Sequence, residues 1–415
     1  MRLLAALLSL AGALAAQTLT VTSARVLLDE TVAIRAAGLT PGERVAIEAS
    51  LTDGGDHRWR SHSEFDAAAD GTVAVDTQAP AKGSYRGVSA MGLIWSMMPE
   101  TKGTARYQPP HQFGVQTIEF KLLRGREAVA TTRLEQATLA EGVARIPVRE
   151  DGLRGLLFVP PGGERHPGVL VVGGSNGGLP GRQAAWLASR GFVALALAYF
   201  RYEDLPQMLE AIPLEYFGRA LIWLSRRPEV AHGERLGMVG TSRGGELALQ
   251  LGSMYPQIGA VVAYVPASVR VRACCGMTAI TYAWTWKGQP LAYVMRPAQR
   301  GGAGGFTAAI AVENTRGPVL MISGESDHVW PSAEMADEVV SRLRRNHFPF
   351  SCENLKYRGA GHDAGQPGFV PAWHGTVRNP TSGQEMDLGG SPAAEAASVL
   401  EAMPKVLAFL RQSLP

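Results

Sequence analysis

The residues best suited to chemistry form a Gly-x-Ser-x-Gly motif, Gly240-Thr-Ser242-Arg-Gly244. A short apolar run leads into the motif, and an apolar, helix-forming run follows it. A strand, a sharp turn with an exposed serine and then a helix make up a nucleophile elbow, whose turn strains the serine backbone. Glycines two residues to either side avoid collisions with the neighbouring strand and helix. The motif predicts Ser242 as a nucleophile, although alone it also fits an ordinary strand-to-helix turn.

A serine hydroxyl is a poor nucleophile at neutral pH, so it needs a base within hydrogen-bond reach and a third group that holds the base. In this architecture the chain order is Ser, then Asp or Glu, then His. Asp327 follows the apolar run 318–322 in a loop that opens a helix. His362 follows a further strand, 352–357, in a loop that contains glycines. Successive strand ends in this order predict a relay of Ser242, Asp327 and His362.

Other assignments for the relay are open from the sequence. Glu325 is the rival for the acid, but Asp327 lies deeper in the loop. His328 and His374 are weaker candidates for the base, because neither follows a new strand. Taken singly, Asp327 also fits a helix cap, and His362 also fits a surface histidine.

An oxyanion hole needs two backbone N–H groups aimed at the developing negative charge. One is expected from Arg243, which follows the nucleophile, and the other from the loop after an earlier strand. That loop is the glycine-rich stretch 173–178, in which Gly174, Ser175 and Asn176 are the candidate donors. No Lys-Ser/Thr follows the glycines, so a phosphate-binding P-loop is excluded.

The second part of the chain alternates apolar runs with helix-length segments. The expected strands cover residues 168–172, 192–197, 236–239, 260–264, 318–322 and 352–357. The expected helices cover residues 181–190, 214–227, 243–255, 333–345 and 393–410. Unbroken apolar strands between amphipathic helices indicate a mostly parallel sheet covered on both faces. Ser242 follows a strand end, which is where such sheets place their sites.

The first part, residues 17–145, carries short segments of alternating polarity separated by turn signals such as Pro-Gly and Asp-Gly. Regularly spaced short strands without a long helix predict a β-sandwich. Residues 146–415 then form the α/β domain. The Met-, Trp- and Gly-rich stretch 87–100 fits core or a loop packed on the next domain better than a groove for an apolar ligand.

The N-terminus, residues 1–16, has a positive start, a short apolar run and an Ala-x-Ala end. This pattern predicts a signal peptide and an exported protein, periplasmic or secreted. If residues 1–16 are instead a buried helix, the protein is cytoplasmic. No other segment is apolar enough for a membrane span.

Composition narrows the function classes. The 415 residues are 46% hydrophobic and 19% charged with a net charge of +3, which describes a globular protein without a footprint for nucleic acid. Cys274 and Cys275 are poor partners for each other because they are adjacent, and nothing supports a bridge from either to Cys352. We therefore expect unpaired cysteines. No C-x-x-C metal motif is present, and the relay chemistry needs no metal or redox cofactor.

Several blocks of the sequence resemble the family of acyl-CoA thioesterases and bile acid-CoA:amino acid N-acyltransferases. These blocks are residues 187–199, 202–206, 214–217 and 228–230 in the α/β part and residues 87–100 in the first part. The resemblance covers most of the chain. It implies an N-terminal, immunoglobulin-like β-sandwich on an α/β-hydrolase domain, with the catalytic triad on Ser242, Asp327 and His362.

Two features depart from what the family implies. Its amino-acid-conjugating members use Cys as the nucleophile, whereas Ser242 would form an oxygen ester, at which water competes better with an amine. A signal peptide would also separate the enzyme from the cytosolic CoA pool. We therefore expect a serine hydrolase of acyl thioesters. The alternatives are an exported carboxylesterase or dienelactone-hydrolase-like enzyme, an acyltransferase to glycine or taurine, and a catalytically silent binding protein.

The stretch 268–306 lies between two expected strands and is longer than the usual connection. It fits either a lid that shapes the acyl pocket or an inert insertion.

Overall fold

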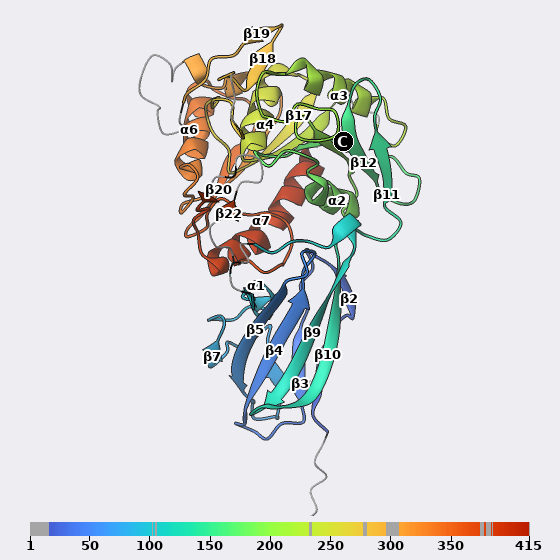
Figure 1. Ribbon diagram of the computed structural model, residues 1–415, viewed down its shortest axis with the longest axis vertical. Helices are drawn as coiled ribbons and strands as arrows, with labels where there is room; N and C mark the ends of the chain where they lie inside the picture. The colour runs from blue at the N-terminus through green and yellow to red at the C-terminus, as the bar shows by residue number, and fades with distance from the viewer. Residues whose placement is uncertain are drawn as a thin grey trace, which may run out of the picture.

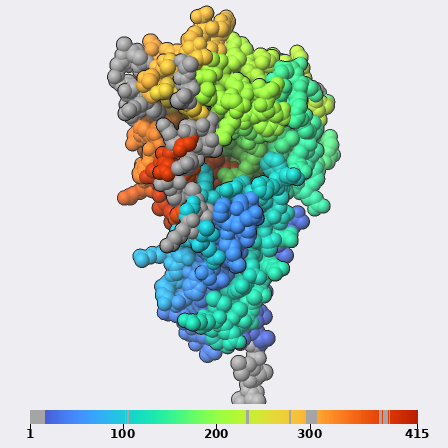
Figure 2. Space-filling model, viewed as in Figure 1, coloured from blue at the N-terminus to red at the C-terminus, as the bar shows by residue number. Residues whose placement is uncertain are grey.

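The computed structural model describes residues 16–101, 103, 106–231, 235–276, 280–295, 307–373, 377–378, 383 and 385–414. Residues 1–15 of the expected signal peptide and the base candidate His374 lie outside the described residues. Figure 1 shows a β-rich part below an α/β part, and Figure 2 shows the two parts packed against each other.

The β-rich part contains two sheets, whose strands pair antiparallel except for β2 and β10, which pair parallel. The smaller sheet has the order β1 (Thr18–Val21), β3 (Ile34–Ala37) and β6 (Val73–Ala74). The larger sheet has the order β2 (Arg25–Leu27), β10 (Glu127–Ala137), β9 (Val115–Arg124), β4 (Arg44–Thr52), β5 (Arg58–Asp66) and β7 (Lys82–Gly83), with β8 (Met98–Pro99) also on β5. Strand alternation turns one face of each sheet inward, so the predicted N-terminal β domain is confirmed.

The segments that predict strands in the first part of the sequence cover residues 18–23, 31–35, 44–51, 71–76, 117–123 and 128–134. Strand β5 has no counterpart among them. Its inward residues are Trp59, Ser61, Ser63 and Phe65, all buried, and its outward residues are polar. Ser61 is tolerated inside because its hydroxyl donates to the Leu93 carbonyl at 2.5 Å. Within the stretch 87–100, residues 91–97 are buried around the short helix α1 (Gly92–Trp95), whereas Val88 and Met98 are exposed, so the centre of the stretch is core.

The α/β part is built on an eight-stranded sheet among the described residues. Its order is β11 (Ala144–Val148), β12 (Arg154–Val159), β14 (Val193–Ala198), β13 (Gly168–Val172), β16 (Leu236–Thr241), β17 (Ile258–Tyr264), β20 (Val319–Gly324) and β21 (Cys352–Tyr357). The strands from β14 to β21 run parallel, and β11 and β12 pair antiparallel at one edge. The mostly parallel sheet confirms the predicted α/β fold class.

Helices cover both faces of this sheet. They are α2 (Gly181–Ser189), α3 (Glu215–Ser225), α4 (Arg243–Met254), α6 (Ser332–Arg345) and α7 (Pro392–Ser413). Helices α2 and α7 share one apolar core with the β-rich part, and α3, α4 and α6 contribute to a second core on the opposite face. Burial on both faces explains why the central strands read as unbroken apolar runs.

Short elements complete the described chain. They are the 3₁₀ helices η1 (His111–Phe113) and η2 (Val312–Asn314), the strands β15 (Ile212–Pro213), β18 (Trp284–Trp286) and β19 (Gln289–Pro290), and the pair β22 (Val377–Arg378) and β23 (Glu385–Met386). None of the helices in the described part of the chain is both long and apolar enough to span a membrane.

Candidate active site

Ser242 stands at the sharp turn between β16 and α4. Its φ of 59° and ψ of −117° are unusual for a residue with a side chain, and its N–H donates to the Tyr264 carbonyl at 2.9 Å. A Cβ at Gly240 would lie 2.0 Å from the Gly244 oxygen, and a Cβ at Gly244 would lie 2.4 Å from the Gly173 oxygen. The two glycines therefore avoid the collisions that the motif predicted.

The structure brings the three predicted relay side chains into one hydrogen-bonded row. The Ser242 Oγ lies 2.8 Å from His362 Nε2, and His362 Nδ1 lies 2.7 Å from Asp327 Oδ2. The other oxygen of Asp327 accepts from the N–H groups of Val329 and Trp330 at 2.9 and 3.2 Å. The Asp327 side chain is fully buried and that of His362 is 9% exposed, so the row is largely screened from water.

The loops that carry Asp327 and His362 are tied to each other. The Ser326 N–H donates to the Ala360 carbonyl at 2.9 Å, and the Leu388 carbonyl accepts from both the His362 N–H at 2.9 Å and the His328 N–H at 3.5 Å. Gly324 ends β20 where a Cβ would lie 2.3 Å from the Gly361 oxygen, so only glycine allows the two loops to approach this closely.

Helix α7 supports the His362 loop from behind. The Glu395 Oε1 accepts from the Gly361 N–H at 2.6 Å, and the Ser398 hydroxyl accepts from the Gly365 N–H at 2.8 Å. Burial raises the pKa of Glu395 to about 8, and the nearby Asp363 carboxylate acts in the same direction. No sequence pattern indicates this role, because Glu395 occupies an ordinary first-turn position of a helix.

The rival relay residues lie elsewhere. Glu325 is exposed, and the Nδ1 of His328 lies 2.8 Å from the Asp387 carboxylate on an exposed surface. His374 lies outside the described residues. Of the described candidates for the acid and the base, only Asp327 and His362 are hydrogen-bonded in the row that starts at Ser242.

The predicted oxyanion residues line the cavity at Ser242. Gly174, Ser175, Asn176 and Arg243 all contribute to its wall. A Cβ at Gly174 would lie 3.1 Å from the Ser242 Cβ, so this loop passes directly beside the serine. Arg243 is the first residue of α4, and a helix has no internal acceptor for the N–H of its first residue.

The side chain of Arg243 belongs to a buried cluster that no sequence motif predicted. Its Nη1 lies 3.2 Å from Glu246 Oε2, its Nη2 donates to the Val271 carbonyl at 2.9 Å, and its guanidinium lies over the Trp284 ring. The Trp284 Nε1–H donates to Glu246 Oε1 at 2.7 Å. Burial raises the pKa of Glu246 against the opposing charge of Arg243. In the sequence, only the three-residue spacing of Arg243 and Glu246, which places them on one helix face, could have indicated this ion pair.

A cavity of about 770 Å³ opens over Ser242 and His362. The apolar residues of its lining include Val271, Val329, Trp330, Met386 and Leu388. The stretch 271–276 also lines the cavity, so the described part of the long connection 268–306 shapes the pocket. Such a volume accommodates a ligand well beyond the size of a few waters.

The charged lining of the cavity is mostly cationic. Arg106, Arg182 and Arg272 line it together with Arg243, and Asp363 pairs with Arg106 at 2.6 Å. Burial and the neighbouring Arg106 lower the pKa of Arg182. Within the described ranges, no group of three or more His, Cys, Asp or Glu side chains is placed to hold a metal ion.

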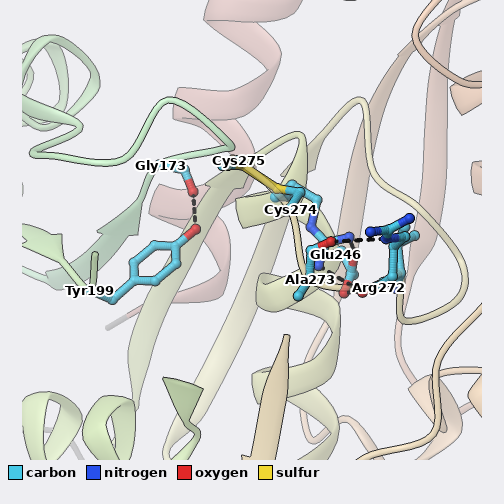
Figure 3. Close-up of a disulfide and its surroundings, with 9 residues drawn as sticks. Gly173, Tyr199, Glu246, Arg272, Ala273, Cys274 and Cys275 are labelled. Atoms are coloured by element: carbon cyan, nitrogen blue, oxygen red, sulfur yellow. Dashed lines mark hydrogen bonds and ion pairs between the residues drawn. A yellow bond between two sulfur atoms is a disulfide. The ribbon is translucent and has the colours of Figure 1, made fainter. Parts of the chain in front are cut away.

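The expectation of unpaired cysteines is wrong for two of the three. Cys274 and Cys275 form a disulfide in the cavity wall, and Cys352 is free (Figure 3). Adjacent side chains ordinarily point apart, but Cys275 has a φ of 81°, which turns the chain and brings both sulfurs to one side.

Comparison with known proteins decides the family. The family described as "BAAT / Acyl-CoA thioester hydrolase C terminal" matches residues 212–415, and "Acyl-CoA thioester hydrolase/BAAT N-terminal region" matches residues 29–150. The human bile acid-CoA:amino acid N-acyltransferase is 32% identical over 413 residues, covering 95% of this chain and 97% of that protein. The chain belongs to the acyl-CoA thioester hydrolase/BAAT family. The predicted family is thus confirmed, and with it the prediction that the chain is an enzyme.

Two further comparisons place the chain among relatives. Mouse acyl-coenzyme A thioesterase 6 is 30% identical over 404 residues, covering 93% of this chain and 94% of that protein. Among solved structures, a puromycin-hydrolyzing peptidase of Mycobacterium tuberculosis aligns with a TM-score of 0.43 and 14% identity, covering 91% of this chain and 54% of that one. The latter similarity is too low to bear on function.

Proposed function

We propose that this protein is a serine hydrolase that cleaves acyl thioesters of the acyl-CoA type through an acyl-Ser242 intermediate. The observation that carries the proposal is the unbroken hydrogen-bonded row from Ser242 through His362 to Asp327 at a strained strand-to-helix turn. Membership of the acyl-CoA thioester hydrolase/BAAT family supports the thioester as the bond that is cleaved.

Each residue of the row has a role in the two half-reactions. His362 Nε2 takes the proton from the Ser242 hydroxyl as the oxygen attacks the thioester carbonyl, and it gives that proton to the departing thiol. Water then attacks the acyl-serine ester, with His362 as the base, and the free acid leaves. Asp327 holds the ring in the required tautomer and stabilises its charged form, because its carboxylate accepts from Nδ1.

The oxyanion of each tetrahedral intermediate is held by backbone N–H groups. We assign one to Arg243 and the other to the loop of Gly174, Ser175 and Asn176. The proximity of Gly174 to Ser242 supports this assignment. Donors that are fixed before the reaction stabilise the developing charge without reorganising.

Hydrolysis is favoured over transfer by the nucleophile itself. An acyl-Ser242 ester is less reactive toward amines than an acyl-cysteine thioester, so water competes better for it. The similarity to a bile acid-CoA:amino acid N-acyltransferase keeps transfer to glycine or taurine as the second candidate.

The test uses the purified protein with acyl-CoAs of several chain lengths and with aryl esters, each with and without glycine. Free acid from the CoA esters is expected, and Ser242→Ala is expected to lower turnover on the order of 10⁶-fold. Ser225→Ala, at an exposed serine of α3, is the matched control and keeps full turnover. Near-normal activity of Ser242→Ala refutes the mechanism. Cleavage of aryl esters alone identifies a carboxylesterase, and acyl-glycine identifies a transferase.

The domain limits and the export signal complete the proposal. Residues 146–415 form the catalytic domain, residues 17–145 form the β-sandwich domain, and residues 1–16 are removed on export. Sequencing the N-terminus of the protein recovered from an expressing cell tests the last point. A start at Gln17 in an exported fraction is expected, and an intact Met1 in the cytoplasm contradicts it.

A further inference from the structure

The Cys274–Cys275 disulfide lies in the wall of the cavity that also contains Ser242 and His362. Cys274 is partly exposed to this cavity, whereas Cys275 is buried, with 5% of its surface accessible. Figure 3 shows the disulfide with its surroundings, which include Gly173 of the glycine-rich loop. The hydrolytic mechanism makes no use of either sulfur.

The backbone around the disulfide is fixed on several sides. The Cys274 N–H donates to the Leu209 carbonyl at 3.2 Å, and the Ala273 N–H donates to the Thr281 carbonyl at 2.8 Å. Two residues earlier along the chain, the Arg272 N–H donates to the Val294 carbonyl at 2.9 Å. The two sulfurs are therefore held at the cavity and do not belong to a free loop end.

The charges near the disulfide favour thiolate chemistry. Arg272 lines the same cavity and lies two residues before Cys274, whereas the charge of Arg243 is opposed by Glu246. Cationic neighbours lower the pKa of thiols, and the thiolate is the species that attacks a disulfide. A thiol that enters this cavity therefore meets a disulfide in surroundings that promote its ionisation.

We propose that Cys274–Cys275 is a thiol–disulfide exchange site for the thiol that thioester cleavage releases at Ser242. This inference rests on the proposed function for the source of the thiol. In the first half-reaction of hydrolysis the thiol leaves into the cavity that the disulfide lines, so product and disulfide share one space.

The exchange is balanced without any further reagent. The thiolate sulfur attacks the Sγ of Cys274, the more exposed of the two residues, and forms a mixed disulfide. The Cys274–Cys275 bond breaks, its electron pair stays on the Cys275 Sγ, and that sulfur takes up the proton that the thiol lost. A second thiol then attacks the mixed disulfide, giving the disulfide of the product thiol and two cysteine thiols.

An experiment with a variant that lacks the nucleophile separates thiol–disulfide exchange from thioester hydrolysis. Ser242→Ala protein is purified without reductant, incubated with coenzyme A as the free thiol, quenched in acid and alkylated in denaturant. Mass spectrometry then counts the alkylated cysteines. One alkylated cysteine, Cys352, is expected before exposure. After exposure all three are expected, or a coenzyme A adduct on Cys274 with the other two alkylated.

Two cysteine variants test whether the change in alkylation comes from the Cys274–Cys275 disulfide. Cys274→Ser should show two alkylated cysteines both before and after coenzyme A, since no disulfide remains to be opened. Cys352→Ser is the matched control and should still open its disulfide. A single alkylated cysteine after exposure to coenzyme A, under conditions in which dithiothreitol opens the disulfide, overturns the proposal. Three alkylated cysteines before any thiol is added also overturn it.

The same protocol with wild-type protein and an acyl-CoA reports on the proposed function. If no acid is released while free coenzyme A still opens the disulfide in Ser242→Ala, the function is wrong and the exchange site stands. If acid is released but the disulfide stays closed, the exchange site is wrong and the function stands.

Discussion

Replacing Glu395 by glutamine should change how the stability of this protein depends on pH. The Glu395 carboxyl is buried under the His362 loop, and its Oε1 accepts the Gly361 N–H. Burial raises its pKa from 4.5 to about 8, with Asp363 and Asp327 acting in the same direction and Arg106 opposing them. Glutamine keeps an acceptor for the Gly361 N–H but has no proton to lose.

The direction in which the free energy of unfolding changes with pH depends on which state, folded or unfolded, holds the Glu395 proton. Between pH 4.5 and about 8 the folded protein keeps the Glu395 proton, whereas the unfolded chain releases it. Because the folded state binds more protons in this window, the free energy of unfolding falls as the pH rises through it. The slope for one such group is about 1.4 kcal/mol per pH unit, so about 3 kcal/mol should be lost between pH 5.5 and 7.5.

The assay is urea unfolding of the wild type and of Glu395→Gln at pH 5.5, 6.5 and 7.5. The quantity to compare is the stability of the variant minus that of the wild type, since the titration of all other groups cancels. This difference should grow by about 3 kcal/mol in favour of the variant over the range. Glu401→Gln, at an exposed carboxylate of the same helix, should show no comparable trend. A stability difference between Glu395→Gln and wild type that does not change with pH refutes the reasoning.

Three other substitutions test the site. Asp327→Asn should lower kcat on the order of 10⁴-fold, because an amide no longer fixes the His362 tautomer, while Asp387→Asn at the exposed His328 pair should not. Gly174→Ala places a Cβ 3.0 Å from the Thr241 oxygen and should lower kcat by about 10²–10³ by displacing the oxyanion loop. Gly173→Ala is the control in the same steady-state assay. Its added Cβ would lie 3.8 Å from the nearest atom, so its kcat should stay close to that of the wild type. Trp284→Phe removes the donor to Glu246 and should cost about 1–3 kcal/mol in urea unfolding, whereas Trp286→Phe should cost less.

The elements that were predicted correctly are those whose environment is uniform along the chain. Strand β13 is buried at every residue and is apolar at every residue, so its bounds could be read directly. The proximity of Ser242, His362 and Asp327 was predictable because each of these residues follows a strand end, and parallel strands bring those ends to one edge of the sheet. The sequence blocks shared with the family further indicated that the β-rich part is an N-terminal β-sandwich.

The missed features depend on contacts between distant segments. Strand β5 buries Ser61, whose hydroxyl finds its hydrogen-bond partner in the Leu93 carbonyl, far along the chain. Glu246 and Glu395 are acidic residues in the first turn of a helix, where a solvent-exposed position is the ordinary expectation. The disulfide depends on the backbone angle at Cys275, which local composition does not encode.

The β-rich part contributes to the site although it supplies none of the three relay residues. The segment after His362 has little regular structure, so its order must come from what packs on it. Helix α7 holds one side, and the β-rich part holds the other: Arg106 pairs with Asp363 at 2.6 Å, and the Ala372 N–H donates to the Trp95 carbonyl at 2.9 Å. A general base works only while its ring stays within hydrogen-bond distance of the nucleophile. The first part of the chain is therefore a support for the His362 loop, which accounts for the single apolar core that it shares with α2 and α7.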